Sequence, residues 1–337
     1  MNSLALDIGG ANLKAADGRG WARSVPFALW REPKRLTHAI EELVRSAPAS
    51  ARLAVTMTGE LCDAFRTKDD GARHILASVA EVSGGREIAV YLVNGRIVSI
   101  DEARERPLLA AASNWHALAH FACRYFGERS GLLIDVGSTT TDIVPIAKGR
   151  VAARGATDTE RLLAGELAYT GVGRTPLCAV THMLPWRGQQ YPVAAEFFAT
   201  TADAYVLLGE IPEQPAAAWT ADGRPLTRTF ACERVARMIC ADNSTFTESD
   251  ALVAAEWVRD AQFAQLKEAA RPVASGLQQP IDRFVISGSG EFLARRIIHE
   301  AWPAGRTISL TEELGPEVGA CAPAHALAVL ARETESQ

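Results

Sequence analysis

Residues 132–146 read LLIDVGSTTTDIVPI, an apolar run that ends in an Asp-x-Gly turn at Asp135 and continues as an alternating run. The pattern predicts two antiparallel strands joined by a tight turn, because glycine accepts backbone angles that other residues avoid. Residues 4–14, LALDIGGANLK, repeat the pattern around Asp7. Two such copies, far apart in one chain, indicate two lobes of related topology.

The segments around these turns have the pattern of an α/β protein. Asn94-Gly95 separates two apolar runs and predicts a hairpin, because this pair supplies the positive φ that a tight turn needs. Further strands are predicted at about residues 21–29, 52–56, 88–93, 96–99 and 282–286, and helices at 33–46, 68–82 and 113–126.

The repeat divides the chain into a first lobe at residues 1–128 and a second lobe at residues 129–337. Within the second lobe, residues 157–270 are mainly helical in pattern and are interrupted by prolines. We interpret them as an insertion that shapes a substrate pocket. A helix rich in small residues is predicted at residues 315–332.

Composition narrows the class of protein. The chain has 337 residues, of which 48% are hydrophobic, so it can bury a large core. The net charge is −5 and the two signs are interspersed along the chain, so there is no basic patch and nucleic acid is not expected as a partner. No stretch approaches the roughly 18 to 20 apolar residues of a spanning helix, which predicts a cytoplasmic protein without a membrane partner. The oligomeric state stays open, with a homo-oligomer as one alternative.

The first loop carries residue types that suit a metal ion and phosphate. A carboxylate at Asp7 can reach hydrated Mg²⁺, and the glycines Gly9 and Gly10 let backbone N–H groups approach phosphate oxygens. Asn12 and Lys14 add a polar group and a positive charge. A plain hairpin with a surface aspartate is the alternative, and the second copy argues against it.

The second loop repeats the aspartate and the glycine at the same spacing. Asp135 is the second candidate metal ligand, and Asp142 adds a further carboxylate. The candidate phosphate-binding residues of this loop are Gly137, Ser138, Thr139 and Thr140. A third turn, after the strand at 282–286, contains Gly288, Ser289 and Gly290, whose small size admits a ligand close to the backbone.

The order of these motifs resembles the actin-like superfold, also called the ASKHA or ribonuclease H-like fold. Two Asp loops, a Gly turn and a terminal small-residue helix correspond to its two phosphate motifs, its adenosine motif and its connecting helix. The resemblance covers most of the chain and implies an α/β, two-lobed fold with a helical insertion in the second lobe.

Within that superfold the chain resembles the hydantoinase/oxoprolinase-related family, in the group linked to tetrahydromethanopterin-dependent one-carbon metabolism and methanofuran or methylofuran biosynthesis. The resembling segments are DIGGANLK (7–14), TMTGELCDAF (56–65), AASNWHALA (111–119), DVGSTTTDIVPI (135–146), TGVGRTPL (170–177), EFFATTADAYVLLGE (196–210) and SGSGEF (287–292).

The resemblance implies a transferase. It would join an aminomethylfuran-methyl diphosphate to the phenol of a γ-glutamyl tyramine- or tyrosine-type acceptor and release pyrophosphate. Mg²⁺ is the expected cofactor, and ATP is not expected to be required. A furfuryl carbon loses diphosphate readily because the furan oxygen spreads the developing positive charge, so the protein mainly has to stabilise the leaving group. Asp142 or Glu60 is the candidate base toward the phenol.

Five further residues are candidates for substrate binding. Arg174, in a Gly-bracketed loop, can clamp a carboxylate or a phosphate, although a surface arginine in a turn has the same pattern. Asn114 begins a predicted helix, so its alternative role is to cap the N-terminus of that helix rather than to bind substrate. Thr200, Thr201 and Asp203 form a polar group inside an apolar run and are expected to face the acceptor pocket.

Three rival functions remain. An ATP-dependent small-molecule kinase would use the same loops, although the GSG of the third turn departs from the GG pair usual in sugar kinases. A non-catalytic, nucleotide-dependent module of the same fold would use them as a switch. ATP-driven opening of an amide ring, as in oxoprolinases, usually needs a longer chain or a partner subunit.

Overall fold

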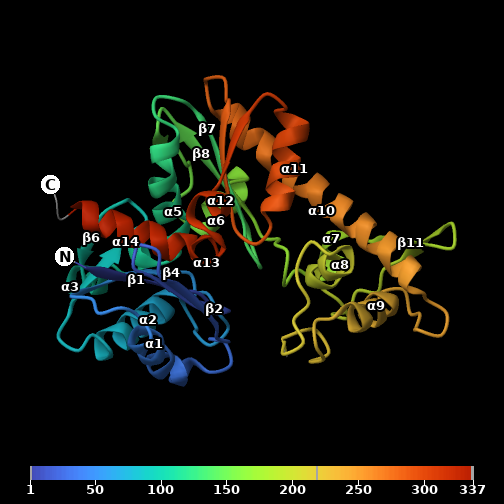
Figure 1. The fold of residues 1–337 in the computed structure, drawn as a ribbon, viewed down its shortest axis with the longest axis horizontal. Coiled ribbons are helices and arrows are strands. Elements are labelled where there is room, and N and C mark those ends of the chain that lie inside the picture. Colours follow the sequence, from blue (N-terminus) through green and yellow to red (C-terminus); the bar gives the residue numbers. More distant parts are fainter. Residues whose placement is uncertain (1, 218, 335–337) are drawn as a thin grey trace.

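A computed structural model describes residues 2–217 and 219–334. Figure 1 shows two lobes, each built on a sheet, and a helical subdomain that projects from the second lobe. Among the described residues, no helix is both long enough and apolar enough to cross a membrane.

The first lobe contains a six-stranded sheet in the order β3-β2-β1-β4-β5-β6. Strands β1, β4 and β5 are parallel, whereas β2, β3 and β6 run antiparallel to their neighbours. Its elements are β1 (Ser3–Ile8), β2 (Asn12–Ala16), β3 (Ala22–Pro26), the 3₁₀ helix η1 (Pro33–Arg35), α1 (Leu36–Arg45), β4 (Arg52–Met57), α2 (Lys68–Glu81), β5 (Glu87–Tyr91), β6 (Ile97–Ser99), α3 (Ile100–Glu105), α4 (Pro107–Ala110), α5 (Asn114–Ala122) and the 3₁₀ helix η2 (Cys123–Tyr125).

The second lobe contains a sheet in the order β10-β8-β7-β13-β14, with β9 also paired to β8. Strands β7, β13 and β14 are parallel, and β8 is antiparallel to β7. Its elements are β7 (Gly131–Val136), β8 (Thr141–Ala147), β9 (Arg150–Val151), α6 (Asp158–Ala164), β10 (Leu167–Ala168), β13 (Arg283–Ser287), α11 (Glu291–Ala301), β14 (Arg306–Ser309), α12 (Leu310–Leu314), α13 (Pro316–Gly319) and α14 (Ala322–Thr334).

The two sheets share one strand pattern. In each, the strand that carries the aspartate lies between its antiparallel hairpin partner and two parallel strands. Both Asp turns also close with the same backbone bond, from Gly9 N to Asn12 O (3.0 Å) and from Gly137 N to Thr140 O (2.9 Å). This duplicated topology is the actin-like, ribonuclease H-like fold that the motif order predicts.

A shared core joins the lobes. The side chains of α5 and α14 pack against Ala5 and Ala54 of the first sheet and against Leu133 and Val285 of the second. Figure 1 shows α14, in red, lying across the first lobe. The terminal helix therefore packs on the first sheet, although the sequence division places it with the second lobe. Two further cores fill the outer faces of the sheets.

The predicted insertion becomes a helical subdomain with its own core, made of side chains between residues 177 and 258. Its long helix α10 continues out of the subdomain, and Leu266 and Ala270 of that helix cover the second sheet. The elements of this region are α7 (Leu177–Val180), β11 (Met183–Trp186), β12 (Gln189–Pro192), α8 (Thr201–Leu208), α9 (Arg228–Arg237) and α10 (Glu248–Gly276).

Candidate active site

The two aspartates lie near the carboxyl ends of β1 and β7, where the lobes face each other. Asp7 is only 4% exposed, and its Oδ1 is buried without a hydrogen-bond partner. The carboxylate of Asp7 accepts a hydrogen bond from Asn114, and that of Asp135 accepts one from Ser287. Asn114, at the start of α5, thus contacts the predicted metal ligand itself.

Burial and mutual repulsion make these carboxylates costly to ionise. Burial raises the pKa of Asp7, while the charge of Lys14 and the bond from Asn114 lower it. The pKa of Asp135 rises to about 7, mainly through burial and then through the charge of Asp142; Asp7 contributes further, and Lys14 acts in the opposite direction. Lys14 therefore stands within electrostatic reach of both aspartates.

This donor set fits Mg²⁺ shared with a phosphate ligand. Mg²⁺ usually takes one or two carboxylates and completes its shell with water and phosphate oxygens. Asp7 and Asp135 supply two carboxylates, and the unpartnered Oδ1 of Asp7 is an available ligand atom. Over residues 2–217 and 219–334, no group of three or more His, Cys, Asp or Glu side chains is arranged as a metal cage.

The third turn lies directly against the second loop. Gly288 has φ of +89°, and a Cβ there would stand 2.6 Å from Oδ1 of Asp135 and 2.3 Å from the carbonyl oxygen of Val136. Only glycine fits this approach, since a side chain would displace the candidate metal ligand. The backbone N–H of Gly290 donates to the same carbonyl of Val136 at 2.9 Å.

A cavity of about 440 Å³ opens beside these loops. Both loops contribute to its wall, together with aromatic side chains and two arginines. The residues that line it are Gly10, Ala11, Trp30, Thr58, Leu61, Cys62, Asp63, Ala112, Asn114, Trp115, Thr139, Thr140, Asp142, Asp158, Arg161, Leu167, Tyr169 and Arg174. Its wall thus combines backbone of the two glycine-containing loops, positive charge and aromatic side chains.

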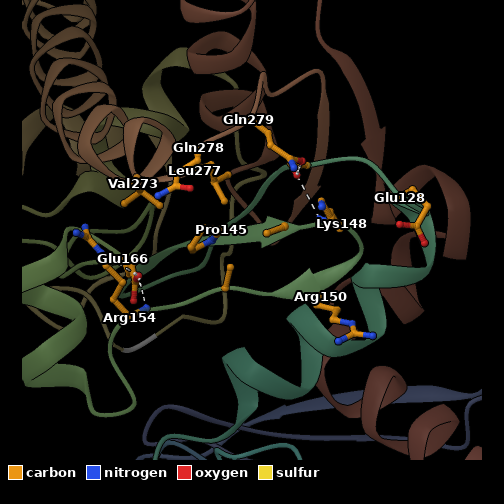
Figure 2. A pocket seen from close by; sticks show the side chains of 14 residues that line it. Glu128, Pro145, Lys148, Arg150, Arg154, Glu166, Val273, Leu277, Gln278 and Gln279 are labelled. Carbon is orange, nitrogen blue, oxygen red and sulfur yellow. Dashed lines mark hydrogen bonds and ion pairs between the residues drawn. The ribbon is translucent and has the colours of Figure 1, made fainter.

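A second cavity, of about 500 Å³, lies at another end of the second sheet (Figure 2). It contains none of the predicted site residues, and four of its polar side chains, Ser130, Arg154, Glu166 and Gln279, are paired within the protein. Ser130 donates to Gln279 at 3.1 Å, and Glu166 accepts the backbone N–H of Arg154 at 2.7 Å. We therefore place the candidate site at the cavity beside the aspartates.

A family model described as hydantoinase/oxoprolinase matches residues 52–333. The chain belongs to the hydantoinase/oxoprolinase family. Two curated relatives carry the name (4-{4-[2-(gamma-L-glutamylamino)ethyl]phenoxymethyl}furan-2-yl)methanamine synthase. The relative from Methanocaldococcus jannaschii is 31% identical over 97% of this chain and 96% of its own length. The relative from Methanococcus vannielii is 29% identical over 60% of this chain and 91% of its own length.

Solved structures resemble this hydantoinase/oxoprolinase family member only distantly. Component A of (R)-2-hydroxyglutaryl-CoA dehydratase from Acidaminococcus fermentans covers 100% of both chains at 12% identity, with a TM-score of 0.47. An archaeal actin homolog in complex with ADP covers 99% of this chain and 100% of its own at 12% identity, with a TM-score of 0.45. These structures are too distant to support an inference. The fold is assigned from the strand order of the two sheets.

The cavity wall of this family member also contains a buried arginine, Arg161, that the sequence patterns do not predict. Arg161 is 1% exposed, donates to Asp142 at 2.8 Å, and lies over the ring of Trp115 at 3.9 Å. Its neighbours Leu162 and Leu163 on α6 are exposed. A helix that buries arginine and exposes two leucines inverts the hydrophobic pattern, so no periodicity could have pointed to Arg161.

Arg174 reaches across the lobe boundary from the second lobe. Its guanidinium lies 4.3 Å from the ring centroid of Trp30, which belongs to the first lobe. Both side chains line the cavity. Partial burial lowers the pKa of Arg174. The stack holds a positive charge at the wall of the cavity, where a ligand anion can meet it.

The structure does not bring Thr200, Thr201 and Asp203 into the cavity wall. All three are buried at the start of α8, where Thr200 and Asp203 form a capping box. Asp203 is paired with Arg234 at 2.7 Å, and both side chains are almost fully buried. These satisfied contacts give the residues structural roles, which corrects the expectation that they face an acceptor pocket.

Glu60 is buried beside the cavity but is not part of its wall. It is 1% exposed, and its Oε2 has no hydrogen-bond partner. Burial raises the pKa of Glu60 from 4.5 to about 7; the charge of Asp158 adds to this effect, while backbone hydrogen bonds and Lys68 oppose it. The folded protein therefore holds this proton more tightly than the unfolded chain does.

Glu60→Gln is expected to stabilise the protein at high pH. Ionisation of Glu60 costs stability as the pH rises from about 4.5 to about 7, and the full cost, on the order of 3 kcal/mol, is present above pH 7. Glutamine resembles the protonated form, so unfolding by urea should show a gain of roughly 1–3 kcal/mol at pH 8 and almost none at pH 4.5. The exposed control Glu41→Gln should show no such difference. Equal effects of Glu60→Gln at both pH values would contradict the assignment.

Proposed function

We propose that this chain transfers an aminomethylfuran-methyl group from a diphosphate to the phenol of a γ-glutamyl tyramine- or tyrosine-type acceptor, releasing pyrophosphate. The observation that carries the proposal is the cavity lined by both DxG loops, two arginines and three aromatic rings. The names of the two curated synthases, which describe a phenoxymethyl furan product, support the same chemistry. The cytoplasm is the expected compartment.

The diphosphate would lie against the two loops. Gly10, Thr139 and Thr140 line the cavity and would supply backbone N–H groups and hydroxyls, and Lys14 adds positive charge near both aspartates. Asp7 and Asp135 would hold Mg²⁺, which supplies charge neutralisation for the leaving pyrophosphate. These groups would stabilise the negative charge that develops on the leaving oxygen and so lower the barrier to loss of pyrophosphate.

The acceptor would lie against the aromatic side of the cavity. Trp30 and Tyr169 offer aromatic surface to a phenol ring, whereas Trp115 is buried beneath Arg161. Arg174 offers a cation to a carboxylate of the acceptor. The bond between the furfuryl carbon and the diphosphate oxygen breaks, and pyrophosphate keeps the electron pair. The phenol oxygen bonds to that carbon and gives up its proton.

Asp142 is the better-placed base of the two candidates. It lines the cavity, whereas Glu60 does not, and a base must first be within reach of the proton. Burial raises the pKa of Asp142, while its contact with Arg161 lowers it. Arg161 thus holds the carboxylate in place and offsets part of the effect of burial on its pKa.

Pyrophosphate release is the direct test. Purified protein with Mg²⁺, the furfuryl diphosphate and γ-glutamyl tyramine should release pyrophosphate and form an aryl ether detectable by mass spectrometry. Omission of either substrate should abolish ether formation. Tight binding of Mg-ATP with phosphorylation of a small alcohol, and no ether, would replace the proposal by the kinase alternative.

A further inference from the structure

Residues 170–175, which we call the backing loop, run directly behind the second DxG loop. Backbone N–H groups of Val172 and Gly173 donate to Gly137 O (3.0 Å) and Ser138 O (2.9 Å), and Arg174 N donates to Ser138 O at 2.9 Å. A Cβ on Gly173 would stand 2.2 Å from Oγ of Ser138. The two loops are therefore in backbone contact, and neither can shift without the other.

The backing loop is in turn held by two helices of the insertion. Thr201, the first residue of α8, donates its hydroxyl to Gly171 O at 2.8 Å. Gln262, in α10, donates through Nε2 to Oγ1 of Thr170 at 2.7 Å and to Gly171 O at 2.9 Å. Thr201 and Gln262 are both fully buried.

The amide of Gln262 uses both of its ends. Its Oε1 accepts the hydroxyl of Tyr205 at 2.5 Å, so the amide orientation is fixed by a donor on one side and two acceptors on the other. A fully buried amide is costly unless all its groups are paired. The amide thus connects α10 to the backing loop, and through it to Ser138, while α8 reaches the same loop through Thr201.

We infer that Gln262 is a positioning residue for the phosphate-binding backbone at residues 137–140. The helical insertion thereby supports the site through the backing loop. None of the described residues in 176–217 and 219–270 lines the cavity, whereas α8 and α10 contact the loop that supports the second DxG loop. The identity of the phosphate ligand rests on the proposed function; the positioning role does not.

Gln262→Met keeps the size of the side chain but removes both donors, so it should loosen the backing loop. Hydrogen–deuterium exchange without ligand should rise at least tenfold for the amides of Val172, Gly173 and Arg174. By calorimetry, the affinity for inorganic pyrophosphate with Mg²⁺ should fall about tenfold, because each lost hydrogen bond to a buried carbonyl leaves that loop less ordered. In steady-state assays, the KM for the diphosphate substrate should rise, whereas the KM for the phenol acceptor should not change.

Tyr205→Phe is the matched control. It removes the other hydrogen bond of the same amide but leaves both bonds to the backing loop, so exchange at residues 172–174 and pyrophosphate affinity should stay at the wild-type level. Thr201→Val, which removes a different donor to Gly171 O, should reproduce the effect of Gln262→Met and replaces that variant if it does not fold.

The inference is overturned if Gln262→Met and Thr201→Val lower only thermal stability and leave exchange at residues 172–174 and pyrophosphate affinity unchanged. A different result separates it from the proposed function. If the wild-type protein neither binds pyrophosphate nor forms the ether, but both variants still raise exchange in the two loops, the transferase proposal fails and the positioning role stands.

Discussion

Asp135→Asn is expected to lower kcat/KM for pyrophosphate release by on the order of a thousandfold, because a preorganised charge at the leaving group is lost. The same change should stabilise the fold. Burial and the neighbouring carboxylates Asp142 and Asp7 raise the pKa of Asp135, so a neutral amide relieves a repulsion that the free protein bears. Initial-rate assays and thermal unfolding of one preparation measure both effects.

Two further variants serve as a parallel test and a control for this prediction. Asp7→Asn should lose activity to a similar extent, and the double variant should be little worse than either, because two ligands of one ion act as a unit. The exposed Asp101→Asn should match the wild-type protein in both assays. If Asp135→Asn kept more than about a tenth of the activity, the assignment of this carboxylate to the reaction would be wrong.

Arg234→Ala is expected to destabilise the helical subdomain by about 3–5 kcal/mol, because it leaves a buried carboxylate without its partner. Arg234 and Asp203 are almost fully buried, and their closest contact is 2.7 Å. Arg234 also binds Asp222 at 3.0 Å and the carbonyl of Pro225. Urea unfolding followed by circular dichroism measures the loss.

A charge-free pair provides the decisive comparison for Arg234. In Arg234→Met with Asp203→Asn, no unpaired charge remains, so stability should recover well above that of Arg234→Ala. Removing the exposed pair Glu41–Arg45 should cost no more than about 0.5 kcal/mol. An Arg234→Ala variant within 1 kcal/mol of wild type would mean that water reaches Asp203.

The backbone around the two aspartates could be predicted because its signals are local. Each DxG turn combines an apolar strand, a glycine and an alternating strand within about a dozen residues, and the structure has both turns where the pattern predicts them. The Asn94-Gly95 hairpin is also present, with Gly95 at φ of +84°. The four-residue strand β14 (Arg306–Ser309) was not predicted, because its two polar ends leave too short an apolar run.

The cavity wall could be predicted only in part, because side-chain roles depend on partners distant in sequence. Asp203 carries a charge that could bind a ligand, but Arg234, 31 residues further along the chain, forms an ion pair with it. Trp30 and Tyr169 lie in unremarkable segments and enter the wall only because the lobes meet there. Sequence patterns indicate which residues can carry charge, whereas tertiary pairing decides which of them stay available.

Helix α14 also determines the order in which the protein can form during translation. Its side chains cover Ala5 and Ala54 on the inner face of the first sheet, together with α5. That face stays without this cover until the ribosome has released residues 322–334, so the lobe made first cannot complete its packing first. The nascent first lobe therefore keeps this apolar face uncovered, and both lobes should reach their final packing together, as one cooperative step.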